Sequence, residues 1–206
     1  EFPNYDLTLR SAISIARRLQ DPLAELIKID PKAIGVGQYQ HDMPEARLDE
    51  VLNGVLEDCV NSVGVDLNTA SCALLSRVSG LNGSIANNIV AYREENGKFR
   101  SRRELLKVNK LGAKAYEQCA GFLRIRDGSN ILDNTAVHPE SYNATEKLLK
   151  LFGYTDEDVA ERKLGDLPVQ IKRYGEQKAA SECGLGVPTM NDVITELLKP
   201  GRDVRD

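Results

Sequence analysis

Two stretches in the middle of the chain share one pattern: Val78-Ser79-Gly80-Leu81-Asn82-Gly83-Ser84-Ile85-Ala86 and Val108-Asn109-Lys110-Leu111-Gly112-Ala113-Lys114-Ala115-Tyr116. Each stretch ends one helical pattern, turns through a loop of small residues around a single Leu, and begins another helix. A loop of this kind directs backbone N–H groups outward at a helix N-terminus, where a phosphate can bind. Two such loops about thirty residues apart therefore predict a module that binds the backbone of a nucleic acid.

A chain that reverses within so short a loop needs a residue with positive φ, which Gly and Asn tolerate. The side chains must also be small, because the backbone has to approach a phosphate oxygen closely. One apolar residue, Leu81 or Leu111, can anchor each loop in the core. Ser84 and Lys114 stand in the first turn of the helix that follows, where a hydroxyl or a cation can reach the same phosphate.

The pattern resembles the helix-hairpin-helix motif, whose hairpin has the form Gly, apolar residue, Gly. Each copy departs from this form once: Asn82 replaces the second Gly of the first copy, and Lys110 replaces the first Gly of the second. Asn is the best substitute for Gly in the left-handed region, so we expect the first hairpin to turn normally. We expect Lys110 to weaken the geometry of the second hairpin while adding a cation.

The charge distribution explains how a chain with a net charge of −4 can bind a polyanion. Residues 1–69 carry 6 Lys+Arg and 12 Asp+Glu, and residues 127–206 carry 10 and 15, so both flanks are acidic. Residues 70–126, which contain both loops, carry 11 and 4, a net charge of +7. Local charge governs affinity for phosphate, so this segment is the candidate binding region.

The candidate nucleic-acid-binding residues are the loop residues and nearby cations: Gly80, Asn82, Gly83, Ser84, Arg102, Arg103, Lys110, Gly112 and Lys114. The alternative is that the loops only pack the two repeats together and that the basic run is a solvated face. One hairpin of such a pair can also serve the structure alone, and in that case we expect the second hairpin to bind, because of its charge.

Apolar residues at helical spacing recur through most of the chain, which predicts an all-α fold with a tandem helix-hairpin-helix domain flanked by additional helices. Asp21-Pro22 is expected to break the first helix, and Gly64 to end a long amphipathic helix that begins at Pro44. Helix starts are expected at Asn68 or Thr69, at Ser101 through a capping box with Glu104, at Thr155 and at Thr189. We expect one helix over 139–152 and a loop over 165–188.

The remaining composition predicts an intracellular, non-membrane protein. No apolar run approaches the roughly 20 residues that span a bilayer. The start is acidic and lacks Met, so we expect a piece of a longer protein, with a linker over 199–206. The widely spaced Cys59, Cys72, Cys119 and Cys183 are expected to be core thiols of a reducing compartment rather than zinc ligands or disulfides.

Longer stretches around the hairpins resemble the Tex family of bacterial transcription accessory proteins: residues 34–42 (IGVGQYQHD), 57–71 (EDCVNSVGVDLNTAS), 119–125 (CAGFLRI) and 136–140 (AVHPE). The resemblance covers nearly the whole chain. It implies a cytoplasmic protein that binds nucleic acid in transcription. It further implies that residues 1–66 are the tail of a YqgF-side region, 67–126 a double helix-hairpin-helix domain, and 127–206 a helical domain leading to an S1 domain.

Two functions are consistent with the sequence. The first is a non-enzymatic module that binds DNA or RNA through phosphates, largely without regard to sequence. The second is an interaction scaffold that positions neighbouring domains or docks onto the transcription machinery. A glycosylase or nuclease is disfavoured, since stacking groups are few, so we expect no catalytic residue, cofactor or metal, and a monomer.

Overall fold

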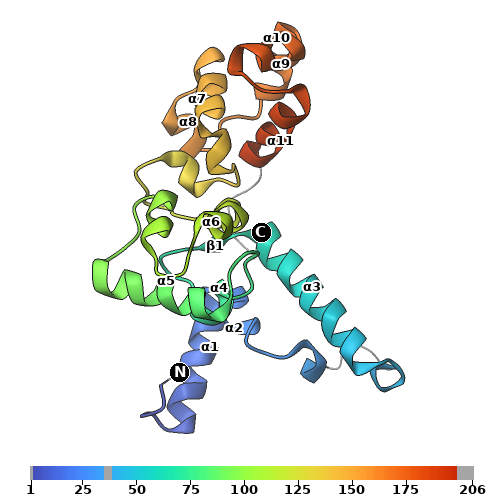
Figure 1. Cartoon of the computed structure of the whole chain (residues 1–206), viewed down its shortest axis with the longest axis vertical. Coiled ribbons are helices and arrows are strands. Elements are labelled where there is room, and N and C mark those ends of the chain that lie inside the picture. The colour runs from blue at the N-terminus through green and yellow to red at the C-terminus, as the bar shows by residue number, and fades with distance from the viewer. Residues whose placement is uncertain (1, 35–38, 199–206) are drawn as a thin grey trace.

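The computed structural model describes residues 2–34 and 39–198, and confirms the all-α fold (Figure 1). The α-helices are α1 (Leu7–Gln20), α2 (Pro22–Leu26), α3 (Glu45–Val63), α4 (Cys72–Leu75), α5 (Gly83–Asn96), α6 (Ala113–Cys119), α7 (Tyr142–Leu151), α8 (Asp156–Ala160), α9 (Leu167–Tyr174), α10 (Glu176–Cys183) and α11 (Val187–Leu198). Short 3₁₀ helices are η1 (Pro31–Ile34), η2 (Gln40–Asp42), η3 (Arg102–Lys107), η4 (Ala120–Phe122), η5 (Ile131–Asn134) and η6 (Pro139–Ser141). Residues 35–38 of the segment that resembles the Tex family and the expected linker over 199–206 lie outside the described residues.

The N-terminal helices follow their local signals. Asp21 ends α1, and its side chain accepts a hydrogen bond from Ala24 N at the start of α2, as Asp21-Pro22 predicted. Helix α3 ends at Gly64, whose φ of +79° is one that glycine adopts readily. Most of α3 is exposed, and Figure 1 shows it projecting from the middle of the molecule.

The middle of the molecule is a compact unit built from α4, α5, η3 and α6, which we call the hairpin unit. Two short strands close it: β1 (Val65–Asp66) pairs in parallel with β2 (Leu123–Arg124), with Val65 opposite Leu123. No pattern in the sequence predicts this pairing. The core of the unit also contains Ile27, Val60 and Val65, which lie ahead of the expected boundary at residue 67.

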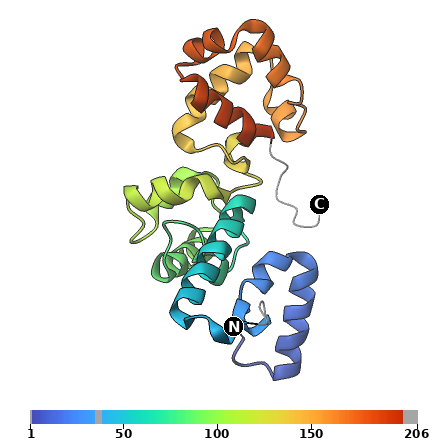
Figure 2. The ribbon, with the colours of Figure 1, turned by 90° about the vertical axis from the view of Figure 1, so that its right-hand side faces the viewer.

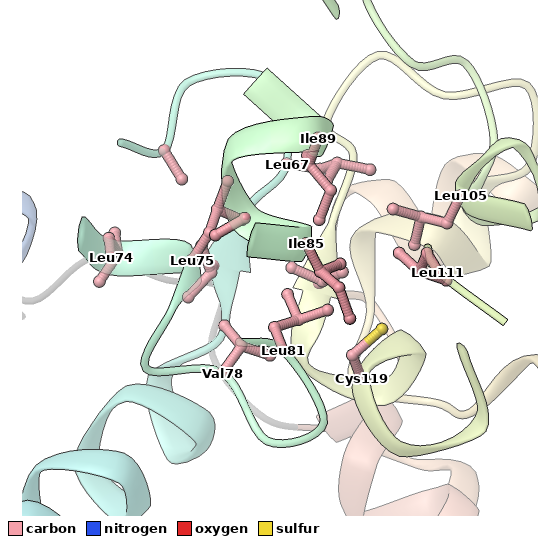
Figure 3. Close-up of a cluster of buried hydrophobic side chains, with 14 of the residues drawn as sticks. Leu67, Leu74, Leu75, Val78, Leu81, Ile85, Ile89, Leu105, Leu111 and Cys119 are labelled. Carbon is pink, nitrogen blue, oxygen red and sulfur yellow. The ribbon is translucent and has the colours of Figure 1, made fainter. Parts of the chain in front are cut away.

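Leu81 and Leu111, the apolar residues of the two loops, are both buried in this core. Figure 3 shows Leu81 beside Val78 and Ile85, with Leu111 beside Leu105. The expectation that one Leu anchors each loop is therefore confirmed. In both loops, the buried leucine side chain attaches the loop to the core.

Helices α7 to α11 surround a second core and form what we call the C-terminal unit, which lies at the opposite end of the molecule from α1 (Figure 2). Here the structure corrects several expectations. Residues 165–188 contain α9 and α10 rather than a loop, and Thr189 lies inside α11 rather than capping it. The helix expected over 139–152 begins as 3₁₀ turn η6. Thr155 does cap α8, through a capping box with Asp158.

Other caps and thiols also differ from expectation. Ser71, not Asn68 or Thr69, caps α4. Residues 102–107 form a 3₁₀ helix, and Glu104 accepts a hydrogen bond from Arg100 N rather than completing a capping box on Ser101. Cys119 and Cys183 are buried, whereas Cys72 is half-buried and Cys59 is exposed, so Cys59 is not a core thiol.

Candidate nucleic-acid interface

The two hairpins have the same hydrogen-bonded frame, repeated at an offset of 30 residues. Leu81 N donates to the Val78 carbonyl at 3.0 Å, and Leu111 N donates to the Val108 carbonyl at 3.1 Å. At the start of the following helices, Ala86 N donates to the Asn82 carbonyl and Tyr116 N donates to the Gly112 carbonyl. The repeat seen in the sequence is therefore a repeat of backbone geometry.

The first position of each hairpin holds the positive φ. Gly80 has a φ of +81° and Lys110 a φ of +66°. Lys110 therefore adopts the turn, although its Cβ disfavours this conformation. Both loops turn at the residue before the buried Leu.

Asn82 and Gly112 have extended backbones and are the N-cap residues of α5 and α6. This corrects the expectation that Asn82 occupies the left-handed region. The Asn82 side chain instead accepts a hydrogen bond from Ile85 N at 2.9 Å, so it satisfies one of the first-turn N–H groups of α5. Gly112 carries no side chain that could do the same for α6.

The hairpins also contact each other. Asn88 on α5 donates to the Asn109 carbonyl at 2.8 Å, and Lys110 Nζ lies 3.2 Å from Ser84 Oγ. Lys110 thus belongs to the second hairpin but reaches the first turn of α5. A cation, a hydroxyl and a helix N-terminus meet at this point, which is the combination that binds an anion.

The remaining candidates divide by exposure. Exposed residues, free to meet a ligand, are Gly80, Asn82, Gly83, Ser84, Arg103, Lys110, Gly112 and Lys114. Arg102 is the exception, because only 1% of it is exposed. Its guanidinium donates to the carbonyls of Leu123, Thr135 and Val137. Arg102 is therefore a buried structural residue and not a phosphate ligand, contrary to the sequence prediction.

Burial also sets the titration of the groups around Arg102. It lowers the pKa of Arg102, an effect that the nearby Tyr142 and Asp133 oppose. It raises the pKa of Tyr142, so the phenol stays protonated and can donate a hydrogen bond. It raises the pKa of Cys119 to about 12, so this thiol is protonated and unreactive at neutral pH.

The sequence reasoning missed a third hairpin, Gly184-Leu185-Gly186, between α10 and α11. It has the full Gly, apolar, Gly form, and Gly184 has a φ of +74°. Met190 N donates to the Gly186 carbonyl, and Leu185 packs against the second core. The pattern itself was the available signal. The charged residues near it in sequence are Lys178, Glu182 and Asp192, so this hairpin stands in a net negative segment, unlike the other two.

Within residues 2–34 and 39–198 no helix combines the length and the apolar character that crossing a membrane requires. The same residues contain no cluster of three or more His, Cys, Asp or Glu side chains placed to hold a metal ion.

Comparison with known proteins agrees with the geometry. A helix-hairpin-helix motif family matches residues 60–124, and a second family described as an HHH domain matches residues 130–205. Both units of the molecule are therefore helix-hairpin-helix domains.

Full-length relatives extend the match to the whole chain. Protein YhgF of Escherichia coli is 56% identical over 100% of this chain, and the transcriptional accessory protein Tex of Neisseria gonorrhoeae is 54% identical over 100% of it. The human S1 RNA-binding domain-containing protein 1 is 36% identical over 97%. The chain spans about a quarter of these relatives, 26%, 26% and 25% of their lengths. It belongs to the Tex family and corresponds to its helix-hairpin-helix region.

Proposed function

We propose that this chain is a non-enzymatic module of a cytoplasmic transcription accessory factor that binds DNA or RNA through the phosphate backbone. The contact between Lys110 and Ser84 supports this proposal most strongly, because it joins the two hairpins at a helix N-terminus. The helix-hairpin-helix match over residues 60–124 and the names of the relatives, which refer to transcription and to an RNA-binding domain, agree with it.

The geometry suggests two phosphate sites. The first lies at the start of α5, where Ser84 and the exposed N–H groups of the first turn are joined by Lys110 from the other hairpin. The second lies at the start of α6, where Gly112 leaves the first turn uncapped by its own side chain and Lys114 adds a cation. Arg103 adds a further exposed cation on η3.

Contacts of this kind carry little sequence information, since backbone amides and lysines meet phosphates that every nucleotide shares. We therefore propose binding that is largely independent of sequence. Each phosphate neutralised by a cation releases counterions, so the affinity should fall steeply as the salt concentration rises.

The test is a binding titration of the 206-residue chain with Lys110→Glu and Lys114→Glu combined. Single- and double-stranded DNA and RNA are titrated across a series of salt concentrations. We expect the double variant to bind every sequence at least about tenfold more weakly at low salt, and its salt dependence to decrease by about two phosphate contacts.

The matched control is Lys150→Glu with Lys172→Glu, which changes the net charge equally at two exposed lysines of the C-terminal unit. This control should reduce affinity only through the weaker long-range field. Binding that is insensitive to salt, or a hairpin variant that binds like its control, would contradict the proposal.

A second candidate is an interaction scaffold that positions neighbouring domains or docks onto the transcription machinery. Exposed apolar residues on the N-terminal helices favour it: Leu7 and Leu19 on α1, and Val51 and Val55 on α3. The acidic flanks suit contacts with basic protein surfaces. If this chain binds no nucleic acid at low salt while a full-length relative does, the scaffold is the better description. Both proposals treat the chain as a monomer.

A further inference from the structure

Arg102 connects the second hairpin to the segment between the two cores. It is the first residue of η3, the 3₁₀ helix that leads into that hairpin. Its Nε donates to the Leu123 carbonyl at 2.7 Å, and its Nη1 donates to the Val137 carbonyl at 2.7 Å. Its Nη2 donates to the Thr135 carbonyl. One side chain on η3 thus holds three carbonyls that lie 21 to 35 residues further along the chain.

The same guanidinium reaches the C-terminal unit. Arg102 Nη1 also donates to Tyr142 Oη at 2.8 Å, and Tyr142 Oη donates to Asp133 Oδ1 at 2.8 Å. Tyr142 is the first residue of α7 and packs against the second core. Asp133 is 2% exposed, and its carboxylate lies 4.0 Å from Arg102 Nε. The network is buried, and the positive charge of Arg102 is balanced by the negative charge of Asp133. It therefore fixes the position of η3 relative to α7.

The first hairpin lacks this connection. The residue that corresponds to Arg102 in the first repeat, 30 positions earlier, is Cys72 at the start of α4. Cys72 lines a cavity of about 760 Å³ between the N-terminal helices and the hairpin unit. Position 102 thus carries a buried network, whereas the equivalent position 72 lines an open space.

We propose that Arg102 is a positioning residue that holds the second hairpin against the C-terminal unit, and thereby holds Lys110 beside Ser84. The second hairpin needs this support because its turn residue is a lysine at positive φ, a conformation that a side chain disfavours. The first hairpin turns at a glycine, and Asn61 and Glu57 of α3 hold it through hydrogen bonds with Ser79. A lysine cannot replace Arg102, because a single ammonium cannot reach the carbonyls that the guanidinium fork spans.

Hydrogen exchange at two amides of the 206-residue chain tests the proposal, because the repeat supplies an internal reference. The amides of Leu111 and Leu81 make equivalent hydrogen bonds in the second and the first hairpin. With Arg102→Lys we expect exchange at Leu111 to accelerate about tenfold more than exchange at Leu81, measured by NMR under native conditions. A role in overall stability alone would accelerate both amides by the same factor, and that result would overturn the proposal.

Two further variants keep the test decisive. Tyr142→Phe removes the hydroxyl and leaves the three carbonyl bonds, so it should fold and show the same selectivity at Leu111 with a smaller factor, about threefold. Arg103→Lys changes the exposed neighbour of Arg102 and should leave the exchange ratio of the two amides unchanged. Selective acceleration at Leu81, or an unchanged ratio in both Arg102→Lys and Tyr142→Phe, would contradict the role of Arg102.

The consequence for binding rests on the proposed function, whereas the exchange experiment does not. If the second hairpin is displaced, Arg102→Lys should weaken binding and reduce its salt dependence by about one phosphate contact, like the loss of Lys110, although Arg102 is buried. If the unmodified chain binds no nucleic acid, the proposed function fails and the exchange ratio still decides the role of Arg102.

Discussion

The two hairpins share one backbone frame but differ at both of its key positions. The first has Gly80 at the positive φ and Asn82 as a side-chain cap, so it forms without strain and satisfies one N–H group of its own helix N-terminus. The second has Lys110 at the positive φ and Gly112 as the N-cap, so it is strained, charged and open. The residues that best form such a loop are thus not those that best bind a phosphate.

This difference suggests that the two hairpins contribute different parts of one binding surface. A non-glycine residue in the left-handed region costs roughly 1–2 kcal/mol, and the second hairpin carries this cost at Lys110. The lysine then reaches Ser84 in the first hairpin, so the strained loop supplies the cation and the relaxed loop supplies the better-formed helix start. In this view the hairpins form one composite surface rather than two independent copies of a site.

The largest expected effect separates the two loop glycines. An added Cβ at Gly80 would lie 2.6 Å from Gln118 Cβ on α6, and φ there is +81°. Gly80→Ala should therefore lower the free energy of unfolding by about 2–4 kcal/mol. Gly112 has an ordinary φ of −83°, and a Cβ there meets nothing within 4 Å among the described residues. Gly112→Ala should change stability by less than about 1 kcal/mol.

Urea denaturation of both variants measures this contrast. Equal losses for Gly80→Ala and Gly112→Ala would mean that the hairpins do not differ in packing as described. A loss confined to Gly112→Ala would reverse the assignment of the tightly packed loop.

A smaller and opposed effect is expected at Lys110. Lys110→Gly removes the side chain from the left-handed position, so stability should rise by up to about 1 kcal/mol, since the relief of strain exceeds the entropy cost of glycine. The same change removes the cation beside Ser84, so affinity for nucleic acid should fall and its salt dependence should decrease by about one phosphate contact. Stability and binding would then move in opposite directions.

The control for this prediction is Lys110→Met, which keeps the strained Cβ and removes the charge. It should weaken binding as much as Lys110→Gly without the gain in stability. If Lys110→Gly instead lowers the unfolding temperature, the lysine stabilises the hairpin by more than its strain costs. The proposal that the second hairpin is strained in order to supply a cation is then wrong.

The parts of the fold that the sequence predicted are those set by neighbouring residues. The signals at Asp21-Pro22, at Gly64 and at the helix start Thr155 act within one turn of the chain, and each was placed correctly. The buried Leu81 and Leu111 were also recognisable, since each is the apolar residue of a short polar loop. The role of Asn82 was misassigned because the residue fits both a left-handed turn and an N-cap, and the preceding Gly80 had already supplied the turn.

The failures involve distant contacts or a different helical period. Arg102 was expected at the surface because its partners, the carbonyls of Leu123, Thr135 and Val137, are far away in sequence. One signal was available in the sequence: Arg102, Leu105 and Val108 repeat every three residues, which is the period of a 3₁₀ helix. All three are buried in the structure. Helices α9 and α10 were missed because each has only 8 residues and each ends at a glycine, Gly175 and Gly184.

The smallest expected effect comes from exchanging the two N-caps. Asn82→Gly removes the hydrogen bond to Ile85 N and should lower stability by a few tenths of a kcal/mol, whereas Gly112→Asn should raise it by a similar amount. Affinity should shift the opposite way, by about two- to threefold, because a side-chain cap competes with a phosphate for the same first-turn N–H groups. Thermal unfolding and titration at low salt would measure both quantities on the same two variants. If affinity instead follows stability, the cap does not compete with the ligand, and the open N-terminus of α6 gives the second hairpin no advantage beyond its charge.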